Sequence, residues 1–127
     1  MVILMDLNCI NVITLAYIGD AVFELYIREL YLEKGIYKVD EIQREVTKFV
    51  CDTGQEKFIK YIMDNNILND EELEIVKRGR NYNRSSHPKN TDIITYKMST
   101  GFEALIGSLY LSNKERLNEI LSYVKEL

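Results

Sequence analysis

Two apolar stretches decide the fold of this chain: LAYIGDAVFELYI over residues 15–27 and GFEALIGSLYL over residues 101–111. Apolar side chains occur nearly all round each stretch, whereas a surface helix is apolar along one side only. Both stretches are therefore predicted to be central helices. Each also carries a glycine in mid-helix, Gly19 and Gly107, which costs about 1 kcal/mol relative to alanine. Close approach of another backbone is a common reason to keep such a glycine, so the two helices are expected to cross there.

Each central stretch carries an acidic residue close to its glycine, Asp20 in the first and Glu103 in the second. A crossing at the glycines would bring the two carboxylates together. A charge in apolar surroundings is costly unless it is paired or bound to a metal. Two close carboxylates repel each other, and a divalent cation such as Mg²⁺ would relieve that repulsion. The residues alone leave an alternative open, in which each acid pairs with an Arg or Lys or caps a neighbouring backbone.

The rest of the chain is also predicted to be helical, because apolar residues recur at spacings of three and four. Helices are expected near residues 10–34, 40–50, 53–63, 69–80, 99–111 and 114–126, with an irregular segment over residues 81–92. Asn11 or Thr14 is expected to begin the first helix, Gly35 to end it, and Asn69 to cap the fourth. Helices with short connections and no linker predict an all-α bundle, with residues 1–127 forming a single domain.

Composition excludes several classes of protein. The chain has 127 residues, 46% apolar and 28% charged, which is typical of one globular domain. The net charge of −4 excludes a protein that coats nucleic acid by bulk charge. A single His and two distant Cys exclude a Cys/His zinc site. No apolar stretch approaches the roughly 20 residues that a membrane span needs, so no membrane association is expected.

A basic segment over residues 77–90 reverses the charge of this acidic chain locally, because it contains five Lys or Arg and no acid. Such a segment suits contact with a phosphate backbone. The candidate RNA-binding residues are Lys77, Arg78, Arg80, Asn81, Arg84 and Lys89. The alternative is a solvated loop whose charges balance the acidic cluster over residues 70–74. His87 in the same segment is a weaker candidate for a general base.

Three segments together resemble the ribonuclease III family. LAYIGDAVFELYIR over residues 15–28 resembles the signature helix of its catalytic domain, and STGFEALIGSLYL over residues 99–111 resembles the second active-site helix. RGRNYNRSSHPKN over residues 78–90 is similar to the connecting segment of the Mini-III ribonucleases, which lack a double-stranded-RNA-binding domain. The resemblance covers nearly the whole chain, and it implies an all-α ribonuclease III-type endonuclease domain.

The resemblance also implies an activity and its partners. Members hydrolyse phosphodiester bonds in double-stranded RNA as homodimers, using Mg²⁺, with Mn²⁺ as a further candidate. The Mini-III enzymes mature the ends of the large-subunit (23S) ribosomal RNA precursor, which is the expected substrate. A large-subunit ribosomal protein is a further candidate partner, and the cytoplasm is the expected location.

Matched by position, the resemblance implies that Asp20 and Glu103 are the catalytic and metal-binding residues and that Tyr17 lies at the dimer interface. Two further carboxylates of the larger ribonuclease III enzymes are replaced here by Ala16 and Thr100. The Mini-III subgroup shares this reduced set. The number of metal ions is left open, and Thr100 is a candidate to contact a water on the metal.

Because two carboxylates of the larger ribonuclease III enzymes are replaced here, a second function stays open. In it the chain is a non-catalytic helical dimer that binds structured RNA or a protein partner, and Asp20 and Glu103 are buried structural acids. Stabilisation by a divalent metal ion would distinguish the two, because a close carboxylate pair gains from the cation and a salt-bridged pair does not.

Overall fold

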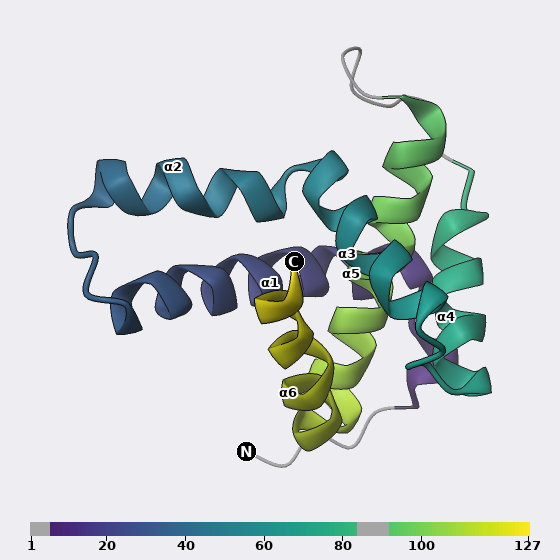
Figure 1. Cartoon of the computed structure of the whole chain (residues 1–127). Coiled ribbons are helices and arrows are strands. Elements are labelled where there is room, and N and C mark those ends of the chain that lie inside the picture. Colours follow the sequence, from purple (N-terminus) through teal and green to yellow (C-terminus); the bar gives the residue numbers. More distant parts are fainter. Residues whose placement is uncertain (1–5, 84–91) are drawn as a thin grey trace.

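The computed structural model describes residues 6–83 and 92–127, and all of its regular structure is helical (Figure 1). The elements are the short 3₁₀ helix η1 (Leu7–Cys9), then α1 (Val12–Glu33), α2 (Val39–Val50), α3 (Asp52–Asp64), α4 (Asp70–Arg80), α5 (Ile93–Ser112), α6 (Lys114–Ser122) and the 3₁₀ helix η2 (Tyr123–Glu126). No strand occurs within these described ranges. The predicted all-α class is confirmed. No helix in the described part is both long and apolar enough to cross a membrane.

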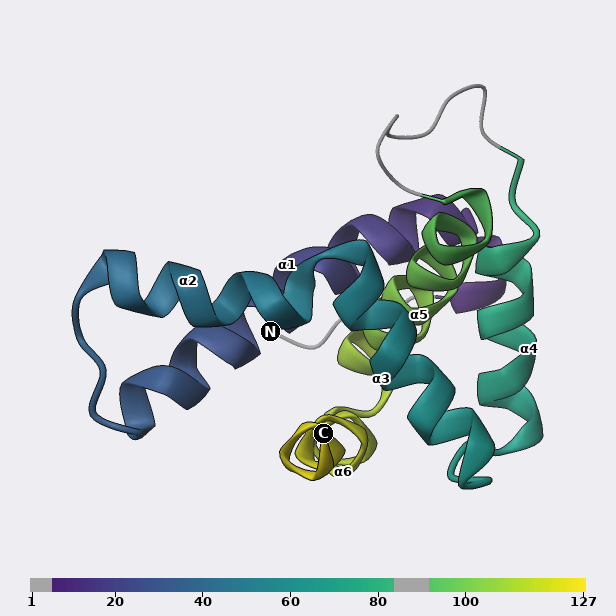
Figure 2. The same cartoon turned by 45° about the horizontal axis from the view of Figure 1, so that its top comes forward.

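Helix α5 runs through the middle of the bundle and packs against α1, α3, α4 and α6 (Figures 1 and 2). Its crossing with α1 occurs at the two predicted glycines. A Cβ atom on Gly19 would overlap the carbonyl group of Glu103, and one on Gly107 would overlap the carbonyl group of Leu15. The backbones meet with no room for a side chain, so the cost of each mid-helix glycine is offset by close packing.

The core joins three helices through a cluster of aromatic rings. Phe23 of α1, Phe58 of α3 and Phe102 of α5 are all fully buried. Phe102 meets the other two rings edge-on, at centroid distances of 4.9 and 5.4 Å. Edge-to-face pairs are favoured by the ring quadrupoles. The cluster therefore packs α1 and α3 against the side of α5 that carries Phe102, the residue directly before Glu103.

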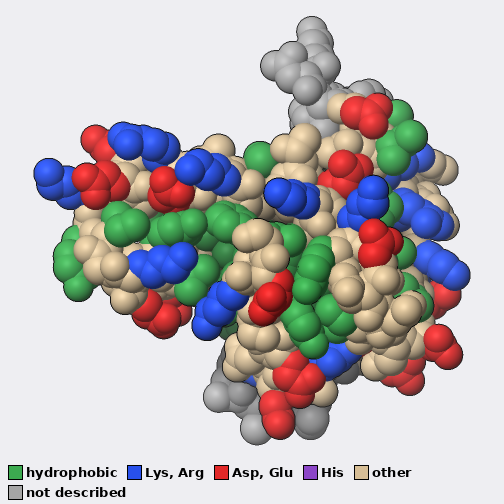
Figure 3. Space-filling model, in the orientation of Figure 1, with side chains coloured by type: hydrophobic (Ala, Val, Ile, Leu, Met, Phe, Trp, Pro, Cys, Tyr) green, Lys and Arg blue, Asp and Glu red, His purple; other side chains and the backbone are tan. Residues whose placement is uncertain are grey.

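The second half of α1 and all of α2 form a hairpin that extends away from the other helices (Figures 1 and 2). The chain reverses at Gly35, whose φ of +90° favours glycine, as the sequence predicted for the end of the first helix. Figure 3 shows charged side chains of both signs along the hairpin, beside a band of hydrophobic side chains. This mixture agrees with a small net charge.

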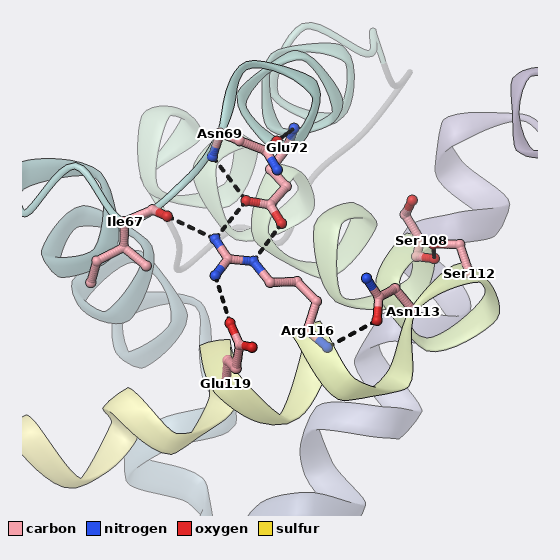
Figure 4. A network of polar contacts seen from close by, with 8 residues as sticks. All are labelled: Ile67, Asn69, Glu72, Ser108, Ser112, Asn113, Arg116 and Glu119. Carbon is pink, nitrogen blue, oxygen red and sulfur yellow. Dashed lines mark hydrogen bonds and ion pairs between the residues drawn. The ribbon is translucent and has the colours of Figure 1, made fainter.

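A partly buried ion pair fixes where α4 begins relative to α6 (Figure 4). Arg116 donates to both carboxylate oxygens of Glu72, at 2.8 and 2.9 Å, and to the carbonyl oxygen of Ile67 at 2.7 Å. Glu72 also accepts from the backbone N–H of Asn69 in a capping box. Burial alone would raise the pKa of Glu72, but these hydrogen bonds outweigh it and lower that pKa.

Two helix boundaries differ from the sequence prediction. Helix α5 begins at Ile93 rather than near Ser99, and α6 ends at Ser122, where the 3₁₀ turn of η2 follows. The extra turns of α5 bury a polar residue, Thr95, and leave Ile93 and Ile94 exposed. The apolar periodicity that marks a buried helix therefore does not extend to its true beginning.

Candidate active site

The structure brings the Asp20 side chain from α1 next to the Glu103 side chain from α5, because each lies beside the glycine crossing. Together they line an open hollow of about 410 Å³. Its other lining residues are Ile13, Thr14, Ala16 and Tyr17, all from α1. Asp20 is exposed, whereas Glu103 is half-buried. One carboxylate thus faces solvent while the other sits deeper between the helices.

The surroundings of Glu103 strongly favour its protonated form. Burial is the largest cause, and the hydrogen bond and negative charge of Asp20 add to it. Together with the charge of Asp52, they raise the pKa of Glu103 to about 9, against the opposing effect of a hydrogen bond from Gln55. At neutral pH the site therefore holds a proton unless a positive charge replaces it.

No basic side chain in residues 6–83 and 92–127 forms an ion pair with Asp20 or Glu103. The alternative in which each acid pairs with Arg or Lys thus finds no support in this part of the chain. In contrast, Glu24, one turn after Asp20, pairs with Arg28 at 3.1 Å on the surface. Glu24 therefore has a basic partner on its own helix, and Asp20 has none among the described residues.

A row of polar side chains behind Glu103 was not predicted from the sequence. Gln55 of α3 donates to Glu103 at 3.4 Å and accepts from Ser99 at 2.8 Å. The Ser99 hydroxyl also lies 2.9 Å from a carboxylate oxygen of Asp52. A signal for Gln55 exists, because it occupies the apolar stripe of its helix, three, four and seven residues before Phe58, Ile59 and Ile62.

The basic segment begins at the end of α4, and the structure describes four of its six candidate residues. Lys77 and Asn81 are exposed, and Arg80 donates to the side chain of Asn81 at 3.3 Å. Arg78 is half-buried and lines a different hollow, of about 690 Å³, beside the acidic first turns of α4. Arg84, Lys89 and His87 lie outside the described residues.

The end of α4 is nevertheless held close to the helix that carries Glu103. A Cβ atom on Gly79 would lie 2.7 Å from the Cα atom of Gly101, so α4 and α5 touch backbone to backbone at this point. Gly101 is two residues before Glu103 in the sequence. The basic end of α4 and the acidic hollow therefore lie beside the same segment of α5, which contains Gly101 and Glu103.

Comparison with known proteins identifies the family. A family model described as Ribonuclease III domain matches residues 13–114, which includes both central helices. The chain belongs to the ribonuclease III family. Relatives named Mini-ribonuclease 3 include one from Streptococcus pneumoniae, 43% identical over 94% of each chain. Another from Clostridium tetani is 43% identical over 96% of this chain and 81% of its own.

A solved structure supports the same assignment. The crystal structure of a protein from Fusobacterium nucleatum superimposes with a TM-score of 0.83 and 31% sequence identity. It covers 97% of this chain and 98% of the other. These findings confirm the predicted resemblance to Mini-III ribonucleases and support the predicted endoribonuclease function. As a family, ribonuclease III enzymes depend on divalent metal ions, act on double-stranded RNA and are typically dimeric.

The two positions where this family member lacks a carboxylate differ in their surroundings. Ala16 lines the acidic hollow. Thr100 does not line it: its side chain is buried and donates to the Tyr96 carbonyl oxygen of its own helix at 3.0 Å. The Thr100 hydroxyl proton is thus used within α5, while its oxygen keeps the lone pairs that accept a hydrogen bond, and a contact with a water on the metal stays a prediction.

Proposed function

We propose that residues 1–127 form a single catalytic domain that hydrolyses phosphodiester bonds in double-stranded RNA with the help of a divalent metal ion. The proposed substrate is the large-subunit (23S) ribosomal RNA precursor, since several relatives are named Mini-ribonuclease 3. The observation that carries the proposal is the pair of acids, Asp20 and Glu103, held together at a backbone crossing. No basic partner lies against them in the described residues.

The chemistry of this pair fits a hard cation. The two side chains supply carboxylate oxygens, which Mg²⁺ prefers, and Mn²⁺ accepts the same ligands. Within the described residues no three His, Cys, Asp or Glu side chains gather closely enough to hold a metal ion. The residues therefore fit one Mg²⁺ held by Asp20 and Glu103, because this ion is commonly bound by one or two carboxylates and keeps several waters.

Each residue of the site then has a distinct task. When bound, the cation supplies Lewis acidity at the scissile phosphate. Glu103 would hold the cation in its ionised form, which burial and the nearby charge of Asp20 disfavour and the positive charge of a bound cation would favour. Asp20 is the exposed one of the two proposed ligands. The apolar side chains of Ile13 and Ala16 line the same hollow.

The RNA itself is held by basic side chains at and after the end of α4. We assign backbone contacts to Lys77, Arg78, Arg80, Asn81, Arg84 and Lys89. A duplex of RNA offers its phosphates and 2′-hydroxyl groups to such residues rather than its base edges. Recognition by shape is therefore expected, with binding that weakens steeply as salt concentration rises.

A homodimer is proposed from the exposed apolar face of α1. Tyr17 is 78% exposed and Leu25 is 57% exposed, which is unusual for large apolar side chains on a helix this central. Between them, Ile18 and Ala21 open onto a second hollow of about 480 Å³ that also involves α6. A second copy seated on this face places Tyr17 at the interface, and two-fold symmetry offers one acidic site to each RNA strand. A large-subunit ribosomal protein is a further proposed partner, and the cytoplasm is the proposed location.

The decisive experiment compares cleavage of a long double-stranded RNA by the wild type and by Asp20→Asn, with and without Mg²⁺. Asp64→Asn is the matched control, since Asp64 is exposed at the far end of α3. Metal-dependent cleavage by the wild type and the control, but not by Asp20→Asn, is expected. Absence of cleavage by a folded wild type would favour the non-catalytic dimer, and equal cleavage by all three would place the chemistry elsewhere.

A further inference from the structure

Gln55 stands out because it is a polar side chain in a position built for an apolar one. Its side chain is 1% exposed, and it lies on the inner face of α3 among Phe58, Ile59 and Ile62. Burial of an amide is unfavourable unless each polar atom finds a partner. The partners that Gln55 finds connect it directly to the acidic site.

The contacts of Gln55 define which way its amide points. Its Nε2 atom donates to the carbonyl oxygen of Val50 at 3.1 Å, and since a carbonyl oxygen only accepts, the NH₂ group must face it. The second N–H of the same group is directed at Glu103 Oε2, 3.4 Å away. The amide oxygen, on the other side, accepts from the Ser99 hydroxyl at 2.8 Å. The orientation is thus determined by two partners that are independent of Glu103.

We infer that Gln55 is a positioning residue of the proposed nuclease site, whose amide holds the Glu103 carboxylate in the orientation that binds the metal ion, and that Ser99 keeps the amide turned toward it. The inference rests on the proposed function. The bond to Glu103, at 3.4 Å, is long for a hydrogen bond, and catalytic hydrogen bonds commonly tighten when substrate binds. An N–H that donates to an ionised carboxylate makes a stronger bond than one that donates to a neutral acid.

Asp52 extends this row by one residue. The single proton of the Ser99 hydroxyl faces two acceptors, Gln55 Oε1 at 2.8 Å and Asp52 Oδ1 at 2.9 Å. One hydroxyl proton cannot make a full hydrogen bond to both. Asp52 therefore competes with Gln55 for Ser99, and the strength of the Ser99–Gln55 contact depends on the residue at position 52.

A purely structural role is the competing explanation, because Gln55 also satisfies the Val50 carbonyl at the end of α2. The two roles differ in what a substitution changes. Loss of a structural bond lowers the melting temperature without metal and leaves metal binding and turnover alone. Loss of a positioning bond weakens the effect of the metal itself, since partners of metal ligands typically change metal affinity or activity by about 10- to 100-fold.

The test is Gln55→Met, which keeps an unbranched side chain of similar length and removes the amide. Two readouts are measured: the Mg²⁺ concentration that gives half of the metal-induced rise in melting temperature, and kcat and KM for a long double-stranded RNA. A rise in that Mg²⁺ concentration or a fall in kcat, by about tenfold or more, is expected, with KM within about twofold of the wild type. Gln43→Met, at an exposed position of α2, is the matched control and is expected to leave both readouts unchanged.

Ser99→Ala provides a second variant in case Gln55→Met does not fold, because it leaves the Val50 bond in place. It is expected to change the same readouts in the same direction by a smaller factor. If the variants lower only the metal-free melting temperature, the role is structural and the inference is overturned. If the wild type shows neither a metal-induced rise nor cleavage, the proposed function itself fails, which is a different and recognisable result.

Discussion

Glu72 and Glu103 are two acids that the fold withdraws from water in opposite ways. Glu72 meets Arg116 at 2.8 Å, and its pKa is lowered despite burial. Glu103 meets another acid, Asp20, and its pKa is raised to about 9, first by burial and then by that neighbour. The comparison teaches that burial alone does not mark a functional acid. The absence of a compensating cation in the described residues around Glu103 distinguishes a ligand site from a structural ion pair.

The largest effect is expected from Glu103→Gln. The change removes a proposed metal ligand, so cleavage of double-stranded RNA should fall by at least about a hundredfold, more than is typical for a residue that only supports a ligand. The variant should be about as stable as the wild type without metal at neutral pH, because the raised pKa already keeps Glu103 neutral there and glutamine is a neutral side chain of similar shape. Cleavage assays and thermal unfolding check this. Wild-type turnover in a folded variant would remove Glu103 from the site.

The matching change at the other acid, Glu72→Gln, should have the reverse profile. It weakens two charge-assisted hydrogen bonds from Arg116, at an expected cost of about 2 kcal/mol of folding free energy. Turnover per folded molecule should stay the same, because Glu72 does not line the acidic hollow. Urea unfolding measured beside single-turnover cleavage checks this. If turnover fell instead, the distinction between the two acids would be lost.

Opposite responses to pH are the next expectation. Because the pKa of Glu103 is raised in the folded state, metal-free stability should fall as pH rises from the ordinary glutamate pKa of 4.5 toward about 9, where the unfolded chain loses its proton first. Glu72, whose pKa is lowered, contributes stability that is present above the ordinary glutamate pKa of 4.5 and is lost as pH falls below it. Thermal unfolding between about pH 3 and about pH 9 checks both trends.

In the same pH series, Mg²⁺ should raise the melting temperature more at high pH than at low pH, since the ion competes with the proton on Glu103. Glu103→Gln should lose both the metal effect and its pH dependence. A metal effect that is independent of pH in the wild type would argue that the ion binds elsewhere.

The smallest expected effect extends the comparison to basic side chains. Arg116 is engaged by Glu72, whereas Arg80 contacts the neutral Asn81 in the described part of the chain. Arg80→Ala should weaken RNA binding and reduce the slope of log affinity against log salt by about 1, with folding unchanged. Lys57→Ala, at an exposed position of α3, is the matched control. An unchanged slope would remove Arg80 from the proposed RNA contacts.

Several helix ends follow from local signals in the sequence. Asn11 accepts from the backbone N–H of Ile13 and caps α1, and Asn69 caps α4, as predicted. The crossing of the central helices was also predictable, since a mid-helix glycine carries a cost that close packing explains. The early start of α5 was not, because its first turns bury polar residues such as Thr95.

By itself, the sequence determined the helical class, the two central helices and the acids they carry, because these depend on residues a few positions apart on one helix. Only the tertiary structure decided which acid is paired with a basic side chain. Arg116 reaches Glu72 across 44 positions, and Gln55 reaches Glu103 across 48. Such contacts depend on how whole helices pack, and no periodicity within a single helix encodes them. The difference between a structural acid and a proposed catalytic one therefore emerges only when the helices are assembled.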